Sequence, residues 1–339
     1  MTERKYHTAI VGATGLVGQE FIKVLQQRNF PMASVHLLAS DRSAGRRMLV
    51  NQTEIEVQEL SPNSFDPVDI ALFSAGTDIS KEYAPIAAKR GAVVVDNSAA
   101  FRMEPGVPLV VPEVNPEDLE HHKGIIANPN CSTIQMVVAL YPLHKVNPIK
   151  RIIVDTYQSV SGTGAAAVDE VIAQSRAVLE SKAAKASVYP HQIAFNLLPE
   201  IDLFLSDGYT KEEWKMIHET RKIMHDETIA ISATCVRVPV LNSHSEAVHV
   251  EFTHAITPQE AREILTGAPG VKVLDDPSAH VYPHPWAAAR TDEVFVGRIR
   301  KDASHPNGLA MWVVADNLRK GAALNAVQIA EVLISRGLV

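Results

Sequence analysis

The chain has 339 residues, enough for two domains of ordinary size. Hydrophobic residues make up 46% of it and charged residues 21%, a composition typical of a globular enzyme. A formal net charge of −7 without any run of Lys or Arg argues against a nucleic-acid partner. No apolar run approaches the roughly 20 residues that a membrane helix needs, so we expect no membrane partner.

The first part of the chain alternates short apolar segments with helical patterns. Segments typical of buried parallel strands occur at residues 8–12, 35–39, 69–73, 92–96 and 124–127. Helical patterns follow the first strand from residue 15 to residue 28 and occupy residues 78–90. A polar, glycine-containing stretch follows the second strand, and a proline-rich connector with a short strand at 109–111 precedes the last. This alternation predicts an α/β fold with a Rossmann-like parallel sheet and helices on both faces.

The character of the sequence changes after about residue 145. A strand rich in β-branched residues is predicted at 149–158, and a long Ala-rich helix at 163–185. A second, charged helix begins after Thr210, which forms a capping box with Glu213. Further strands are predicted at 228–239, 247–254, 294–300 and 311–315. We expect a Rossmann-like domain at 1–131 and an α+β domain with a mixed sheet at 132–318, while a helix at about 319–339 returns to the first domain.

A glycine-rich turn joins the first predicted strand to the first helix. Gly12, Gly15 and Gly18 are spaced three residues apart, and this strand–turn–helix context is typical of a dinucleotide-binding site. The turn would bring backbone N–H groups and the positive helix end to a pyrophosphate. The expected cofactor contacts here are Gly12, Thr14, Gly15, Leu16, Val17 and Gly18. The alternative is a glycine-rich turn without a ligand.

The loop after the second strand bears on which nucleotide is bound. Enzymes that use NAD commonly place a carboxylate here to hold the ribose hydroxyls. This chain has Ser40, Arg42 and Ser43, which suit a 2′-phosphate, although Asp41 lies among them. We therefore expect NADP as the cofactor, with a solvated basic loop as the alternative.

The two cysteines differ in context. Cys235 lies in an apolar strand and is expected in the core, whereas Cys131 follows Asn130 at the start of a predicted helix, where the helix field favours the thiolate. A thiolate beside a nicotinamide can add to an aldehyde, and hydride transfer to NADP then leaves a thioester. Two thiols do not form a disulfide framework, and no signal peptide precedes the first strand, so we expect a cytoplasmic protein. Two distant cysteines and scattered histidines predict no metal site.

The run Asn-Pro-Asn-Cys-Ser-Thr at 128–133 resembles the signature of the aspartate-semialdehyde dehydrogenase family. Other runs typical of that family occur in its order at 12–18, 40–45, 73–76, 96–102, 158–162, 212–215, 237–246 and 316–323. The ordered set covers nearly the whole chain and is much more specific than any single run.

The resemblance implies a cytoplasmic homodimer that reduces aspartyl phosphate to aspartate semialdehyde with NADPH, on the route to lysine, threonine and methionine. Its second domain would be the catalytic and dimerisation domain. Cys131 would be the nucleophile, His244 the general acid/base, and Gln158 the residue that orients the carbonyl or thioester. The other implied contacts are Arg237 and Glu212 for the substrate, Arg102, Asn130 and Lys215 for phosphate, and Ser161, Gly162 and Asn317 for NADP.

The chemistry of the substrate supports these roles independently. An amino acid needs a cation and an anion to hold it, and phosphate needs further cations. Arg237 lies in an apolar strand, where an unpaired charge is costly. Glu212 and Lys215 share a helical face and could equally form a surface ion pair, and Glu213 could serve only the capping box. Ser243 stands where the family often has Gly, so a positive φ there would strain the turn.

Three other functions fit parts of the sequence. An N-acetylglutamyl-phosphate reductase shares the Cys–His thioester chemistry but needs no site for a free ammonium group. Glyceraldehyde-phosphate dehydrogenase shares the chemistry too, but the 128–131 turn and the Arg42 loop fit it poorly. A non-catalytic NADP-binding protein would use Cys131 as a redox sensor and would show no phosphate-dependent reduction of NADP.

Overall fold

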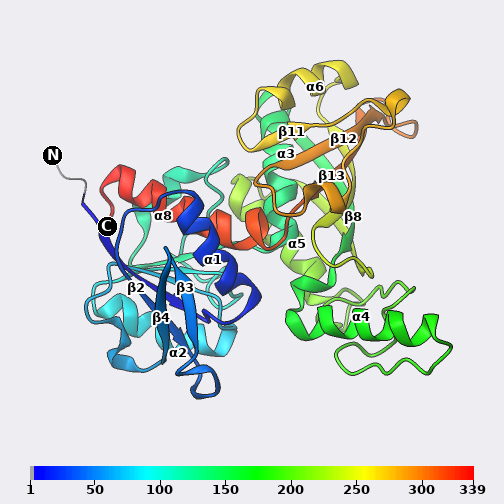
Figure 1. The fold of residues 1–339 in the computed structure, drawn as a ribbon. Helices are drawn as coiled ribbons and strands as arrows, with labels where there is room; N and C mark the ends of the chain where they lie inside the picture. The colour runs from blue at the N-terminus through cyan, green and yellow to red at the C-terminus, as the bar shows by residue number, and fades with distance from the viewer. Residues whose placement is uncertain (1–3) are drawn as a thin grey trace. The chain divides into compact units, whose positions relative to one another are not determined.

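The computed structural model describes residues 4–339, which form two compact units. The first unit contains the described residues up to Asn130 together with Ala322–Val339. The second unit is Cys131–Gly321. Figure 1 follows the chain through both units, with the carboxyl-terminal helix in red among the elements of the first.

The first unit is built on a seven-stranded sheet in the order β3-β4-β2-β1-β5-β6-β7. Its strands are β1 (Tyr6–Val11), β2 (Met32–Ala39), β3 (Arg47–Val50), β4 (Thr53–Glu59), β5 (Ile70–Phe73), β6 (Val93–Asp96) and β7 (Ile125–Ala127). All neighbouring strands are parallel except the β3–β4 hairpin. The predicted Rossmann-like parallel sheet is thereby confirmed.

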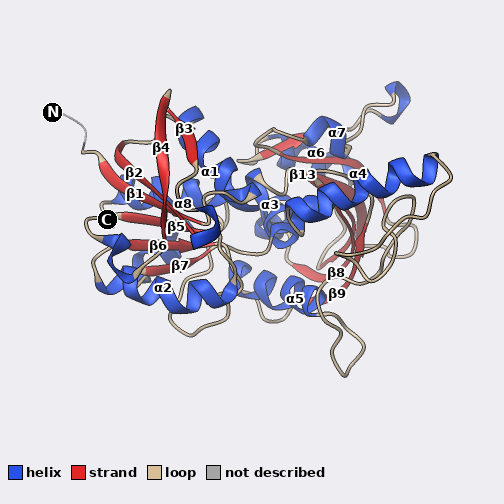
Figure 2. Ribbon diagram, turned by 60° about the horizontal axis from the view of Figure 1, so that its bottom comes forward, coloured by secondary structure: helices blue, strands red, loops and turns tan. Residues whose placement is uncertain are grey.

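Helices cover both faces of this sheet (Figure 2). Alternate residues of a strand point to opposite faces, so Ile10 and Ala9 of β1 belong to different cores. On the face of Ile10, the strands pack against α1 (Leu16–Gln27) and α8 (Leu324–Arg336). On the face of Ala9 they pack against α2 (Thr77–Lys89). Residues from both ends of the chain therefore share one core.

Two sequence predictions for the first unit need correction. The stretch after β2 was expected to be a polar connector, but it contains the β3–β4 hairpin. Its strands are mostly exposed, with only Val50 and Val57 buried, so the apolar signal is weak. The expected strand at 109–111 is a single bridge between Leu109 and Ala127. Flanking Pro108 and Pro112 lack the N–H groups that a longer ladder needs.

The second unit is built on a six-stranded mixed sheet in the order β11-β12-β13-β10-β8-β9. Its strands are β8 (Ile149–Gln158), β9 (Ala230–Arg237), β10 (His244–Phe252), β11 (Val271–Val273), β12 (Val294–Lys301) and β13 (Gly308–Ala315). The pairs β8–β9 and β11–β12 are parallel and the others antiparallel, which confirms the mixed sheet. In this register the carboxyl ends of β8 and β9 meet the amino end of β10, because Gln158 pairs with Arg237 and Ser245 with Tyr157.

The helices of the second unit are α3 (Cys131–Val146), α4 (Ala165–Leu179), α5 (Lys211–Met224), α6 (Pro258–Thr266) and α7 (Pro285–Ala288). Helix α3 packs against β8, β10, β12 and β13, while α5 packs against α3 and β9. The predicted Thr210–Glu213 capping box is present. Helix α4 is shorter than the predicted 163–185, because Gly164 has φ +113° at its start and Ser181 has a positive φ after its end. Within residues 4–339, no helix is long and apolar enough to cross a membrane.

Tight helical turns complete the structure. Short 3-10 turns lie at Asp41–Ser43, Pro62–Phe65, Pro116–His121, Val160–Gly162 and Pro277–Ala279. A π turn at Arg319–Ala323 precedes α8, where the sequence predicted continuous helix from about residue 319.

Candidate active site

The glycine-rich turn of the first unit joins the carboxyl end of β1 to the amino end of α1. A Cβ on Gly12 would lie 2.3 Å from the carbonyl oxygen of Ser74, and Gly12 also has φ +86°. A Cβ on Gly18 would lie 2.2 Å from the Gly12 oxygen. The turn therefore admits only glycine at these positions. The N–H groups of the first helical turn, from Leu16 to Gly18, have no intrahelical acceptor and are available to a phosphate.

The loop after β2 lies beside this turn. The Thr14 hydroxyl donates to the Ser43 hydroxyl at 3.3 Å, which links the two segments. The Asp41 carboxylate accepts the backbone N–H of Arg42 at 2.7 Å, so it caps the loop. Ser40 and Arg42 are exposed, and in residues 4–339 no carboxylate pairs with the Arg42 guanidinium. The loop thus offers an uncompensated cation and two hydroxyls next to the glycine-rich turn.

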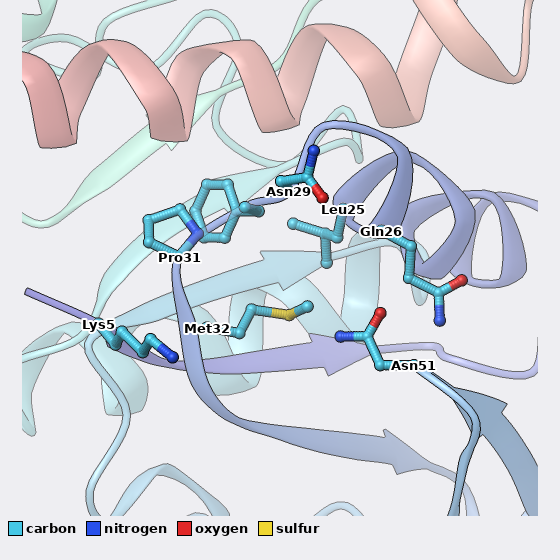
Figure 3. Close-up of a pocket in the computed structure, with 8 residues that line it drawn as sticks. Lys5, Leu25, Gln26, Asn29, Pro31, Met32 and Asn51 are labelled. Atoms are coloured by element: carbon cyan, nitrogen blue, oxygen red, sulfur yellow. The ribbon is translucent and has the colours of Figure 1, made fainter. Parts of the chain in front are cut away.

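A cavity of about 300 Å³ in the first unit lies at the opposite edge of the sheet (Figure 3). Lys5 precedes β1, and Pro31 and Met32 lie at the start of β2, so these residues mark the amino ends of the strands. Ligands of open α/β sheets bind beyond the carboxyl ends instead. This cavity is therefore distinct from the nucleotide site indicated by the glycine-rich turn.

The segment before Cys131 is held by buried polar contacts within the first unit. Arg102 is buried, and its guanidinium donates to the backbone oxygens of Asn128 at 3.0 Å and Asn97 at 2.8 Å. The Asn128 side chain donates to the Asn97 side chain at 2.8 Å and accepts from Asn325 of α8 at 2.7 Å. Asn130 is buried as well. These contacts fix the turn that leads into the nucleophile candidate.

Cys131 is the first residue of α3 and is partly exposed. Gly321 leaves space for the Cys131 side chain, because a Cβ added at Gly321 would lie 2.8 Å from the Cys131 Cβ. The other thiol, Cys235, is fully buried on β9, and burial raises its pKa well above the ordinary value. The structure thus confirms that Cys235 belongs to the core, and it leaves Cys131 as the thiol that a substrate could reach.

Three strands of the second unit bring Gln158, Arg237 and His244 together. Gln158 and Arg237 are paired neighbours at the ends of β8 and β9, and His244 begins the adjacent β10. All three are buried. A Cβ on Gly162 would lie 3.1 Å from Arg237 Nη1 and 3.3 Å from His244 Nε2, so a glycine keeps the space beside both side chains open.

Helix α5 adds a carboxylate and an amine to this cluster. Glu212 is buried and accepts from Gln158 at 3.1 Å and from Lys215 at 3.1 Å. Lys215 also donates to Asp202 at 2.7 Å. Burial acts to lower the pKa of Lys215, but Glu212 and Asp202 outweigh it and raise that pKa. The predicted i,i+3 ion pair is thus present, but it lies against the strand ends rather than on the open surface.

Glu213 has a different role from Glu212. Its carboxylate accepts the backbone N–H of Thr210 at 2.7 Å and that of Cys235 at 3.1 Å. It therefore caps α5 and fixes the helix against β9. Of the two glutamates, Glu212 is the one whose carboxylate meets Gln158.

A hydrogen-bond network surrounds His244. The backbone N–H of Ser159 donates to Nδ1 of His244 at 3.0 Å, and the Ser159 hydroxyl lies 3.1 Å from the same nitrogen. The Asn317 side-chain oxygen accepts from the hydroxyls of Ser159 and Ser161 and from the N–H of Ser243. Burial, and then the Arg237 guanidinium, lowers the pKa of His244 to about 3. His244 is therefore a neutral imidazole in this environment.

The turn before His244 is strained. Ser243 has φ +73°, so the position where the family often has glycine does require the left-handed region in this chain. The Ser243 N–H is held by Asn317 at 2.9 Å, and its buried hydroxyl has no partner in the described part of the chain. The surrounding hydrogen bonds hold a conformation that serine alone disfavours.

The sequence-predicted residues fall into two groups. Those in the second unit are Cys131, at the start of α3, and a cluster that consists of Gln158, Ser161, Gly162, Glu212, Lys215, Arg237, His244 and Asn317. Those in the first unit are Gly12, Thr14, Gly15, Leu16, Val17, Gly18, Ser40, Arg42, Ser43, Arg102 and Asn130. Sequence reasoning missed Ser159 and Gly321, whose importance depends on contacts that no local pattern reveals.

The chain is similar to known proteins over nearly its whole length. Residues 7–122 match the family model for the semialdehyde dehydrogenase NAD-binding domain, and residues 140–320 match the model for the dimerisation domain. The aspartate-semialdehyde dehydrogenase of Aquifex aeolicus (strain VF5) is 60% identical over 338 residues, with 98% of this chain and 99% of the relative covered.

Solved structures extend the likeness to three dimensions. The structure of aspartate-semialdehyde dehydrogenase II complexed with ASA from Vibrio cholerae is 47% identical, with a TM-score of 0.96, 98% of this chain covered and 99% of that chain. The Candida albicans enzyme with NADP is 27% identical, with a TM-score of 0.78, 99% of this chain covered and 100% of that chain. The chain therefore belongs to the aspartate-semialdehyde dehydrogenase family and has that oxidoreductase activity in the biosynthesis of the aspartate-derived amino acids.

Proposed function

We propose that this enzyme interconverts L-aspartate-4-semialdehyde and L-aspartyl-4-phosphate through a thioester on Cys131, with NADP as the hydride carrier. The observation that carries the proposal is the cluster of Arg237, Glu212, Gln158 and His244 at the strand ends of the second unit. It holds a buried cation, a buried carboxylate and a neutral imidazole together. That set matches an α-amino acid that must be bound while its side-chain carbonyl reacts.

The substrate is held through its two charges. The Arg237 guanidinium would bind the α-carboxylate, because its Nη1 donates to Ser159 while its buried Nε has no partner in the described residues. Glu212 would bind the ammonium group, and Gln158 would orient the carbonyl or the thioester. Lys215, Arg102 and Asn130 are the residues proposed for phosphate. His244 would act as the general acid/base at the reacting carbonyl group.

NADP is proposed rather than NAD because of the loop after β2. The exposed Arg42 has no carboxylate partner in residues 4–339 and, with Ser40 and Ser43, would hold a 2′-phosphate. The pyrophosphate would bind at the turn that begins α1. Ser161, Gly162 and Asn317 would contact the nicotinamide side of the cofactor. The relative from Candida albicans was solved with NADP.

The enzyme is further proposed to be a cytoplasmic homodimer whose catalytic and dimerisation domain comprises residues 132–318. Support comes from the dimerisation-domain match and from exposed apolar side chains in this domain. Phe195, Leu197, Leu203 and Phe204 are each more than half exposed, which is unfavourable unless a partner covers them. Sedimentation at twice the mass of one chain would support this state, and a monomer at all concentrations would contradict it.

A phosphorylating reductase for an N-acetylated substrate is the nearest rival. Such a substrate has no free ammonium group, so a buried carboxylate aimed at its amino nitrogen would be unfavourable. The buried carboxylate of Glu212 would be useful only if the substrate had a free amino group. The geometry therefore favours the aspartyl substrate.

The decisive experiment measures NADP⁺ reduction with aspartate semialdehyde in the presence of phosphate or arsenate. Wild type is expected to be active, and Cys131→Ala is expected to lose activity while it still binds NADP. Cys235→Ala is the matched control, because this thiol is buried in the core and should be dispensable for chemistry. A folded wild type that binds NADP but leaves aspartate semialdehyde unchanged would overturn the proposal, and N-acetylglutamate semialdehyde would be tested next.

A further inference from the structure

Helix α4 holds the irregular segment that follows it at residues 187–194. The buried carboxylate of Glu170 accepts the three consecutive backbone N–H groups of residues 187–189, at 2.7, 2.6 and 3.4 Å. One turn further along α4, the Gln174 side-chain oxygen accepts the N–H groups of residues 193 and 194 at 2.9 and 3.1 Å. Backbone donors in a segment without regular structure need acceptors, and a carboxylate is a stronger acceptor than a neutral group. Two side chains of α4 therefore set the conformation of this segment.

Tyr189 is the side chain through which this segment reaches the strand ends. Its phenol donates to the Thr163 hydroxyl at 2.9 Å, and its ring packs against the apolar cluster that contains Val160 and Val171. Burial raises the pKa of Tyr189, while the Arg237 guanidinium acts to lower it, so the two side chains lie within electrostatic range of each other. The phenol is protonated near neutral pH and keeps its donor.

The turn that ends at Thr163 carries groups that orient Arg237 and His244. It begins at Ser159, whose carbonyl oxygen accepts Arg237 Nη1 at 2.7 Å and whose N–H donates to His244 Nδ1 at 3.0 Å. A Cβ on Gly162 would lie 3.1 Å from the same Arg237 Nη1. A displacement of this turn would therefore displace the Arg237 guanidinium.

The two ends of the turn are held differently. At its start, the Val160 N–H donates to the Val240 oxygen at 2.9 Å, and the serine hydroxyls of the turn bond to neighbouring side chains. At its end, the Thr163 N–H bonds back into the turn at 3.0 Å, and Gly164 follows with φ +113°. Within residues 4–339, the Tyr189 phenol is the only side-chain partner of Thr163. This phenol thus links the end of the turn to the segment held by α4.

The same segment continues to the main chain of Arg237. The Leu198 N–H donates to the Arg237 oxygen at 3.0 Å, and the Arg237 N–H donates to the Leu198 oxygen at 2.8 Å. Arg237 is therefore held at two points: its backbone pairs with Leu198, and its guanidinium bonds to Ser159 of the turn that Tyr189 contacts.

We propose that Tyr189 is a positioning residue of the aldehyde reaction. Its bond to Thr163 fixes the end of the 159–163 turn, and this turn holds the Arg237 guanidinium where it binds the substrate carboxylate. Glu170 acts one step further back, because it fixes the backbone that carries Tyr189. The inference rests on the substrate-binding role proposed for Arg237.

A double-mutant cycle in the full-length enzyme tests the Tyr189–Thr163 pair. Tyr189→Phe and Thr163→Val each remove one partner of the hydrogen bond and keep the shape of the side chain. Each is expected to lower kcat/KM for aspartate semialdehyde by about 10-fold, less than the roughly 10²-fold cost of a full 1 Å misplacement. The loss should lie mainly in KM, because the carboxylate is bound in the ground state and the transition state alike. The double variant is expected to lose about 10-fold as well, since both substitutions break the same bond.

Two results of this cycle would overturn the proposal. One is a double variant whose loss is the product of the single losses, about 100-fold, because the two side chains would then act independently. The other is a lower thermal midpoint in Tyr189→Phe with unchanged KM, which would show a role in stability alone. Tyr282→Phe is the matched control, because this exposed tyrosine of the same unit has no hydroxyl hydrogen bond within the described residues.

Variants of Glu170 test the earlier step. Glu170→Ala removes the acceptor of three N–H groups and is expected to raise KM by about 10-fold, like Tyr189→Phe. Glu170→Gln keeps one side-chain oxygen, and the two shortest bonds both use a single oxygen of Glu170, so this variant is expected to recover most of the loss. Wild-type KM in Glu170→Ala, or equal impairment of two folded Glu170 variants, would contradict the holding role.

Arg237→Ala separates failure of this inference from failure of the proposed function. If Arg237→Ala leaves kcat/KM unchanged, the substrate-binding role of Arg237 is wrong, whatever the cycle shows. If Arg237→Ala impairs the reaction while the effects at Tyr189 and Thr163 multiply, only the positioning role of Tyr189 is wrong.

Discussion

The two units present their chemical groups in opposite ways. In the first unit, the glycine-rich turn offers backbone N–H groups, and Arg42, the side chain proposed to select NADP, is exposed. In the second, Arg237, Glu212 and His244 are at least nine-tenths buried and are connected through Gln158, Ser159 and Gly162. In the proposed function, the nucleotide is therefore bound by local chain geometry, whereas the small charged aldehyde is bound by side chains from separate strands.

This difference determines how strongly each region should respond to substitution. Solvent screens an exposed charge, so its removal changes binding modestly. When a buried charge is removed, its partner is left as an unpaired buried group. The loss of free energy is then several-fold larger than for an exposed charge. Substitutions of the buried charged residues Arg237 and Glu212 should therefore affect the aldehyde reaction strongly and leave NADP binding intact, whereas those in the loop after β2 should do the reverse.

Arg237→Ala gives the largest expected effect. Loss of the buried guanidinium removes the proposed ligand of the substrate carboxylate and should lower kcat/KM for aspartate semialdehyde by about 10²–10³, corresponding to roughly 3–4 kcal/mol. Steady-state kinetics and NADP titration measure the two quantities separately. Arg151→Ala is the control, because Arg151 lies on β8 of the same sheet but forms an ion pair with Glu251 that is half exposed. Equal losses of kcat/KM in the two variants would contradict the expectation that a buried charge contributes more than an exposed one.

Gly321→Ala tests whether the position of the nucleophile depends on space. The new Cβ would lie 2.8 Å from the Cys131 Cβ, so the cysteine must shift by several tenths of an ångström or more. A misplacement of this order is expected to lower kcat by about 10–100-fold with unchanged NADP affinity. The rate of Cys131 alkylation by iodoacetamide measures the shift directly. Gly267→Ala is the control, since its Cβ would meet no atom closer than 3.8 Å and its φ is negative. Full activity of Gly321→Ala would show that the helix start tolerates the side chain.

Arg42→Ala tests the expected smaller contribution of an exposed charge. Loss of a charge-assisted contact to the 2′-phosphate should lower the preference for NADPH over NADH by about 10-fold, from an interaction of roughly 1.5 kcal/mol. The readout is the ratio of kcat/KM values for the two cofactors. Arg47→Ala is the control, because Arg47 forms an exposed ion pair with Glu54 on the β3–β4 hairpin. An unchanged ratio in Arg42→Ala would assign cofactor preference to other groups.

The same contrast explains what the sequence could predict. The turn at Gly12 is visible in the sequence because its requirements are local: a strand, closely spaced glycines and a helix. The Thr210–Glu213 capping box is visible for the same reason. The exposed β3–β4 hairpin was missed because strands with few buried side chains lack a strong apolar pattern.

The cluster proposed to bind the substrate could not be derived from local patterns. Gln158 and Arg237 are neighbours only because β8 and β9 pair in one particular parallel register, and a shift by one residue would place their side chains on opposite faces. Ser159 matters through a single backbone N–H, which every residue except proline possesses. The family resemblance named most members of the cluster, but the hydrogen bond from Ser159 to His244 and the space left by Gly321 required coordinates.

Ser243→Gly gives the smallest expected effect and tests the rigidity of the buried cluster. Serine at φ +73° costs about 1–2 kcal/mol, and its buried hydroxyl has no partner in the described residues. Glycine relieves both, but it loses about 0.5–1 kcal/mol through greater freedom of the unfolded chain. The net expectation is a gain of about 1 kcal/mol in the free energy of unfolding, measured by the shift in denaturant midpoint. Ser304→Gly on an exposed loop is the control and should be neutral or slightly destabilising. A destabilised Ser243→Gly would mean that serine contributes a contact that outweighs its strain, and the turn would then be held by its side chain rather than by the Asn317 hydrogen bond to its N–H.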